Sequence, residues 1–184
     1  MSIRRFFPIA LATMCLICGC SGPVADNPAL WPIEPIEVFI QINDEFGDNL
    51  LDDSTVGNWS DTTFKCRFEG LVHQCDRNTV IDQDHVMDED YFYGITIARI
   101  LVSETISIPV IGFGAFSGKR QMDDEVVFLW PDGSEDTVHI KNTFYYNDKG
   151  YPISKRKYYL NGEECTNWIT LIKEPFDEEE TGEE

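Results

Sequence analysis

The sequence lacks the apolar spacing of an amphipathic helix: no segment of helix length has apolar side chains recurring at three- and four-residue intervals. It is also poor in basic residues, with 14 Lys and Arg against 33 Asp and Glu, so the net charge is −19. A field of this sign repels phosphate backbones, which argues against nucleic acid as a partner. Most of these acidic side chains are expected to lie on a solvated surface.

No hydrophobic run reaches the roughly 20 residues of a membrane-spanning helix. The apolar segment at residues 6–17 is shorter and follows Arg4 and Arg5, a pattern typical of a secretory signal. It ends in the sequence LICGCS at residues 16–21, which resembles a bacterial lipobox, with Cys18 as an unusual second residue. We therefore expect a signal peptide at residues 1–19 and a lipid on Cys20; ordinary signal cleavage and a retained anchor are the alternatives.

Composition divides the rest of the chain into three parts. Residues 20–35 are rich in proline and have no hydrophobic period, which predicts an extended, lipid-anchored tether. Residues 36–174 hold the apolar segments and are expected to form one domain. Residues 175–184 are mostly acidic and too poor in apolar side chains to fold, which predicts a disordered tail.

Within the domain, apolar and polar residues alternate in the way typical of half-buried strands. The clearest examples are residues 36–42, 62–68, 124–130 with 135–140, and 153–160 with 163–172. Asn161 and Gly162 separate the last pair and predict a type I′ turn. The fold expected is all-β, an antiparallel β-sandwich of immunoglobulin-like or transthyretin-like type, with a small lipocalin-like barrel as the alternative.

Three cysteines lie in this domain. A type II′ turn at Gly70 and Leu71 would place Cys66 opposite Cys75 at a distance suited to a disulfide. Such a bridge would stabilise the domain by about 2–3 kcal/mol, and two buried thiols are the alternative. Cys165 is expected to share a face with Ile169 and Leu171 as a small buried apolar residue rather than a nucleophile.

Acidic and aromatic residues provide the ligand candidates. Calcium takes carboxylate oxygens, so the loop that carries Asp44, Asp48 and Asp52 is a candidate site, as is the acidic stretch at residues 82–90. Neither matches the calcium-loop pattern, and solvated loops are the favoured interpretation. No other cofactor is indicated. Exposed aromatic side chains can stack on sugars but more often fill cores; the candidates are Trp59, Trp130, Trp168 and the tyrosine pairs Tyr91/Tyr93 and Tyr145/Tyr146.

Three segments, residues 36–52, 130–137 and 159–162, resemble small lipoproteins of Bacteroidales-type bacteria. These proteins are usually secreted β-sandwich or lipocalin-like domains, so the resemblance implies a fold and a place in the bacterial cell envelope, but no catalytic residue. We expect a lipid-anchored protein with a non-catalytic binding, adhesion or assembly role, whose partners are the bilayer, through Cys20, and a glycan or protein. The alternative is a small envelope hydrolase of glycosidase type.

Overall fold

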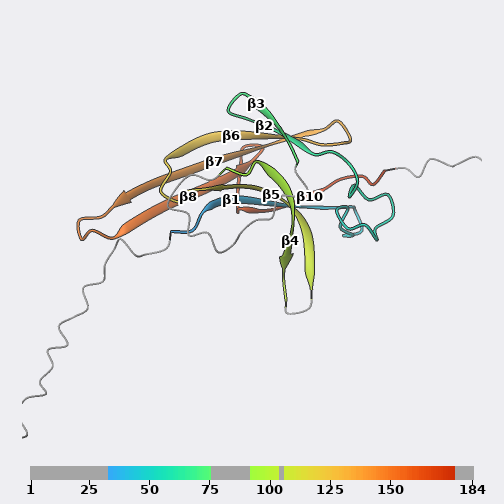
Figure 1. Ribbon diagram of the computed structural model, residues 1–184, viewed down its shortest axis with the longest axis horizontal. Coiled ribbons are helices and arrows are strands. Elements are labelled where there is room, and N and C mark those ends of the chain that lie inside the picture. Colours follow the sequence, from blue (N-terminus) through green and yellow to red (C-terminus); the bar gives the residue numbers. More distant parts are fainter. Residues whose placement is uncertain (1–32, 76–91, 104–105, 177–184) are drawn as a thin grey trace, which may run out of the picture. The chain divides into compact units, whose positions relative to one another are not determined.

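The computed structural model describes residues 33–75, 92–103 and 106–176, which belong to one compact unit. Their ten strands form two sheets that pack against each other as a β-sandwich (Figure 1). The strands are β1 (Ile36–Asn43), β2 (Lys65–Phe68), β3 (Leu71–Gln74), β4 (Ile95–Leu101), β5 (Ser107–Phe116), β6 (Met122–Leu129), β7 (Glu135–Tyr146), β8 (Pro152–Leu160), β9 (Glu163–Cys165) and β10 (Trp168–Ile172). No helix able to cross a membrane occurs in these described ranges.

The strand order is β10-β1-β5-β4 in one sheet and β3-β2-β6-β7-β8-β9 in the other. Two separate sheets, as the described residues form them, confirm the sandwich and not the barrel. One pairing departs from the antiparallel expectation, because β10 runs parallel to β1, with Ile169 opposite Ile40. The predicted single strand at residues 163–172 is therefore wrong: β9 pairs with β8, and the chain then changes sheet to form β10.

Alternation along the strands explains why the sheets pack. Ile36, Val38, Ile40 and Ile42 are buried on one face of β1, and the residues between them are partly exposed. Burying each such side chain stabilises the fold by about 1.5–3 kcal/mol. Aromatic rings fill the space between the sheets: Phe113 of β5 contacts Phe68 of β2 and Phe128 of β6 at centroid distances of 5.4 and 5.9 Å.

Two hairpins of the six-stranded sheet have two-residue turns. Asn161 and Gly162 have φ angles of 50° and 90°, and Leu160 pairs with Glu163, which confirms the expected turn between β8 and β9. In the β2–β3 hairpin the turn residues are Glu69 and Gly70, with φ angles of 49° and 77°. Both turns thus have two successive positive φ angles, as type I′ requires.

The Glu69-Gly70 turn lies one residue earlier than the predicted Gly70-Leu71 turn, so the cross-strand partner of each β2 residue differs from the prediction by two positions. Cys66 pairs with His73, and the N–H of Cys75 donates to the carbonyl of Phe64. Cys75 stays on the same face as Cys66 but lies diagonal to it, two positions beyond His73, where Cα atoms are about 7–8 Å apart and outside the usual disulfide range. The expected disulfide between Cys66 and Cys75 is consequently not formed; Cys66, Cys75 and Cys165 are all thiols in this structure.

Candidate functional site

A pocket of about 490 Å³ opens on the inner face of the β7–β8 hairpin. The alternation along β8 turns Pro152, Ser154, Arg156 and Tyr158 to this face, and β7 contributes Phe144, the cross-strand partner of Ser154. The remaining walls come from elsewhere in the chain. They are Ile33 and Glu34, which precede β1, and Asn167, which joins β9 to β10.

Arg156 holds the pocket together. It pairs across the hairpin with Asn142, and its Nε donates to the side-chain oxygen of that residue at 3.4 Å. Its Nη1 and Nη2 donate to the backbone carbonyls of Pro35 and Glu34 at 2.7 and 2.9 Å. Within the described residues these contacts use three of the five N–H groups of a guanidinium, which leaves one N–H on each terminal nitrogen for water or a ligand.

Tyr158 is the buried polar group of the pocket. Only 6% of its surface is exposed, and its hydroxyl has no hydrogen-bond partner in the described structure. Burial raises the pKa of Tyr158, while the neighbouring Arg156 opposes that rise without reaching hydrogen-bond geometry. Since Glu37 and Glu34 also raise this pKa, the phenol keeps its proton at neutral pH.

Glu37, on β1, belongs to the same electrostatic neighbourhood. Burial raises its pKa, whereas a hydrogen bond from Tyr93 and the charge of Arg156 lower it in part. The hydroxyl of Tyr93 donates to Oε1 of Glu37 at 3.3 Å. Burial and the adjacent carboxylate of Glu37 raise the pKa of Tyr93 as well. This end of the sandwich therefore combines one guanidinium with two carboxylates, those of Glu34 and Glu37.

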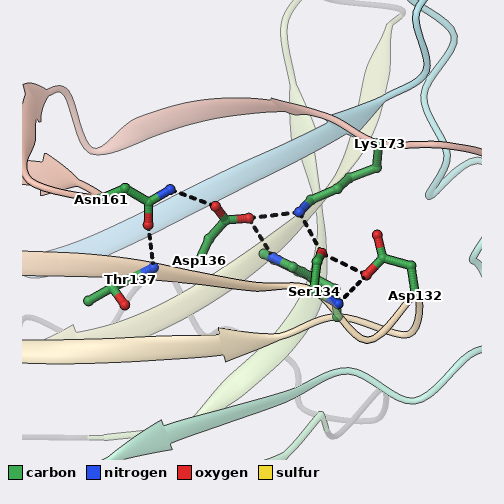
Figure 2. A network of polar contacts seen from close by, with 7 residues as sticks. Asp132, Ser134, Asp136, Thr137, Asn161 and Lys173 are labelled. Atoms are coloured by element: carbon green, nitrogen blue, oxygen red, sulfur yellow. Dashed lines mark hydrogen bonds and ion pairs between the residues drawn. The ribbon is translucent and has the colours of Figure 1, made fainter.

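A second polar network lies at the other end of β7, where Asp136 is buried (Figure 2). Its Oδ2 is 2.9 Å from Nζ of Lys173 and accepts a hydrogen bond of 2.7 Å from Nε1 of Trp130. Its Oδ1 accepts from the side chain of Asn161 at 2.7 Å. Burial would raise the pKa of Asp136, but the hydrogen bonds from Lys173, Asn161 and Trp130, together with the charge of Lys173, outweigh it and lower the pKa.

This network is structural rather than open to a ligand. Asn161 comes from the β8–β9 turn, and its Oδ1 also accepts from the N–H of Thr137. Lys173 follows β10 and donates to Oγ of Ser134, in the β6–β7 turn (Figure 2). The network thus joins the end of the four-stranded sheet to two turns of the six-stranded sheet.

Two of the three tryptophan candidates are buried in the core. Trp59 and Trp130 are buried in the core, where Trp130 stacks on Phe128 at 5.5 Å, so neither presents a ring face to a ligand. Trp168 is half-buried against Phe39, with ring centroids 6.0 Å apart. Of the tyrosine pairs, Tyr145 and Tyr146 are exposed.

The candidate calcium ligands Asp44 and Asp52 accept hydrogen bonds from backbone N–H groups of their own loop. Oδ1 of Asp44 accepts hydrogen bonds from the backbone N–H groups of Phe46 and Asp48, and Oδ1 of Asp52 accepts from Ser54. Among the described residues no group of three or more side chains is placed to hold a metal ion. The acidic stretch at residues 82–90 lies outside the described residues, as does Cys20.

Among the described cysteines, Cys66 is the cross-strand neighbour of His73. Burial, followed by the neighbouring Cys75, raises the pKa of Cys66 to about 12, and burial raises that of Cys165. Because the thiolate is the nucleophile, these shifts oppose covalent catalysis. His73 packs edge-on against Phe92, and Nε2 of His139 lies 2.5 Å from Oδ1 of Asp123.

Sequence reasoning missed the pocket residues Arg156, Tyr158 and Asn167. The period-two spacing of the first two within the expected strand 153–160 was the available signal, because residues two apart share a face. Comparison of the chain with protein families, with curated proteins and with solved structures found no match.

Proposed function

We propose that the protein is a lipid-anchored protein of a bacterial cell envelope whose β-sandwich domain binds a ligand and carries out no chemistry of its own. The observation that carries this proposal is the lipobox-like end of the apolar N-terminal segment, in which Gly19 precedes Cys20. Two or more acyl chains on one cysteine give stable membrane attachment. The proline-rich sequence that follows suits a domain held away from the bilayer.

The pocket supports a binding role over a hydrolytic one. A glycosidase places two carboxyl groups on opposite sides of the scissile bond. Among the described residues that line the pocket, Glu34 is the one acid. Cys66 and His73 are cross-strand neighbours, but the raised pKa values of Cys66 and Cys165 give no support to a cysteine nucleophile.

Substitution of the acceptor cysteine tests the proposal. We expect the wild-type chain to incorporate labelled palmitate in bacterial cells and to sediment with membranes, and Cys20→Ala to lose the label and enter the soluble fraction. Cys18→Ala is the matched control: it replaces a cysteine two residues away and leaves Gly19-Cys20 intact, so labelling should persist. A wild-type protein that sediments with membranes but takes no label would overturn the lipid anchor and indicate a retained helix.

A further inference from the structure

The pocket combines an apolar wall with a polar one, and this combination defines the ligand it suits. Its volume of about 490 Å³ lies within the range of small-molecule sites. It occupies the inner face of the β7–β8 hairpin beyond Ile140 and Tyr158, the last cross-strand pair that is buried in the core. From there to the hairpin tip the inner face carries polar and aromatic side chains.

The polar wall mainly offers hydrogen-bond donors. Tyr158 has a hydroxyl without a partner in the described structure, and Arg156 has one uncommitted N–H on each terminal nitrogen. Asn167 is exposed at the rim and adds a side-chain amide. A buried hydroxyl without a partner is costly, so a ligand oxygen that reaches Tyr158 gains free energy by satisfying it.

The charges of the site favour a neutral ligand. Arg156 has the largest charge effect on the pKa of Tyr158, and Glu37 and Glu34 oppose it. A carboxylate or phosphate would meet Glu34 in the pocket wall and the chain's net charge of −19. An ammonium group would be repelled by Arg156 and could accept no hydrogen bond from the donors of the wall. A ligand hydroxyl group can accept a hydrogen bond from the donors of the polar wall and can donate one to the carboxylate of Glu34, so neutral hydroxyl groups suit both.

The apolar wall supplies a surface for a flat ring. Phe144 lines the pocket, and its ring meets that of Tyr146 edge-on at 5.2 Å. Tyr146 is two residues further along β7, on the same face, and 54% of its surface is exposed. The aromatic surface therefore continues from the pocket towards the hairpin tip, which suits a ligand made of successive rings.

From these features we propose that the pocket binds a neutral saccharide. One pyranose ring packs its C–H face on Phe144 and turns its hydroxyl groups to Tyr158, Arg156 and Asn167, and a second ring reaches Tyr146. This assignment deepens the proposed binding role of the domain and does not depend on the lipid anchor.

The test measures glycan binding by the full chain extracted from membranes in detergent. The probes are the neutral trisaccharides maltotriose, cellotriose, mannotriose and N-acetylchitotriose, the acidic trisaccharide trigalacturonate and the polycation spermidine. We expect at least one neutral trisaccharide to bind, and trigalacturonate and spermidine not to bind. Tyr158→Phe should raise the dissociation constant about fivefold to tenfold, the value of one hydrogen bond. It should not lower the melting temperature, because it removes a hydroxyl without a partner.

Two matched controls separate this site from general effects on the hairpin. Tyr159→Phe changes the next residue of β8, on the opposite face, and should leave binding unchanged. Phe144→Leu should weaken binding, whereas Tyr145→Leu, on the opposite face of β7, should not. The assignment is overturned if no neutral trisaccharide binds, if an acidic or cationic probe is preferred, or if Tyr158→Phe and Phe144→Leu bind as the wild type does. Because binding is measured on solubilised protein, failure here leaves membrane attachment and palmitate labelling as a separate result.

Discussion

The two ends of β7 are each tied to the four-stranded sheet by a basic side chain, but the acceptors differ in kind. At the Asp136 end the acceptor is a buried carboxylate, and Lys173 follows the last strand of the opposite sheet. At the Asn142 end the acceptors are the backbone carbonyls of Glu34 and Pro35, immediately before β1, and the donor is Arg156. We call these the Asp136 clamp and the Arg156 clamp.

This difference separates stability from binding. The Asp136 clamp is closed, since the carboxylate accepts from Lys173, Trp130 and Asn161 and both members of its ion pair are nearly buried. The Arg156 clamp is half-open: its guanidinium keeps uncommitted N–H groups and lines a pocket. A planar guanidinium can hold two carbonyls and still face a ligand, whereas an ammonium is a single point of charge. The Asp136 clamp therefore serves the stability of the fold, and the Arg156 clamp forms part of the candidate binding pocket.

The largest effect is expected from breaking the Asp136 clamp. Asp136→Asn removes the charge that compensates Lys173 and places an amide among three donors. Loss of one partner of a buried ion pair costs several kcal/mol, and we expect the free energy of unfolding to fall by about 3 kcal/mol. Urea denaturation measures this directly. Asp123→Asn, an exposed aspartate on β6, is the control and should leave stability nearly unchanged; equal effects of the two would contradict the structural role of the Asp136 clamp.

A smaller effect is expected from Arg156→Lys in the other clamp. Lysine retains the charge but cannot reach two carbonyls and Asn142 at once, so we expect stability to fall by about 1–2 kcal/mol. Lys157→Arg, the adjacent residue on the exposed face of β8, serves as the control. A loss as large as that of Asp136→Asn would show that both clamps serve folding equally, and the distinction between them would then fail.

The alternation of apolar residues made the β-sandwich predictable. Two features of the sandwich, the Glu69-Gly70 turn and the parallel pairing of β10 with β1, were not predictable in this way. Asn161-Gly162 is recognisable because asparagine and glycine both tolerate positive φ. Glu69 gives no such signal, since glutamate seldom adopts this conformation. A sequence that offers a single glycine therefore suggested the wrong turn, and with it the wrong partner for Cys66. The parallel pairing of β10 with β1 brings together residues more than 100 positions apart, for which no local pattern exists.

The candidate site was predictable only in part. The expected strand at 153–160 already placed Ser154, Arg156 and Tyr158 on one face. What the sequence could not show is that Glu34 and Asn167 complete the walls, because the three segments meet only through the packing of two sheets. Of the aromatic residues predicted as sugar-stacking candidates, Trp59 and Trp130 are buried in the core, where their size suits the packing. The candidates Tyr145 and Tyr146 are exposed at the end of β7.

The smallest effect expected is a difference in pH dependence between the clamps. The pKa of Asp136 in the folded protein lies below its ordinary value of 3.8, because the hydrogen bonds from Lys173, Asn161 and Trp130, with the charge of Lys173, outweigh the effect of burial. Its contribution to stability is therefore fully present well above pH 3.8 and is lost as the pH falls through the lower folded value.

A single group changes stability by at most about 1.4 kcal/mol per pH unit. The carbonyl acceptors of Arg156 are backbone groups without a titratable proton. Urea denaturation between about pH 6 and pH 2.5 should show the wild type and Asp136→Asn converging in acid, while the wild type and Arg156→Lys stay the same distance apart. Parallel curves for the first pair would mean that Asp136 is not ionised in the folded clamp, and convergence of the second pair would mean that a carboxylate, rather than a carbonyl, is the main acceptor for Arg156.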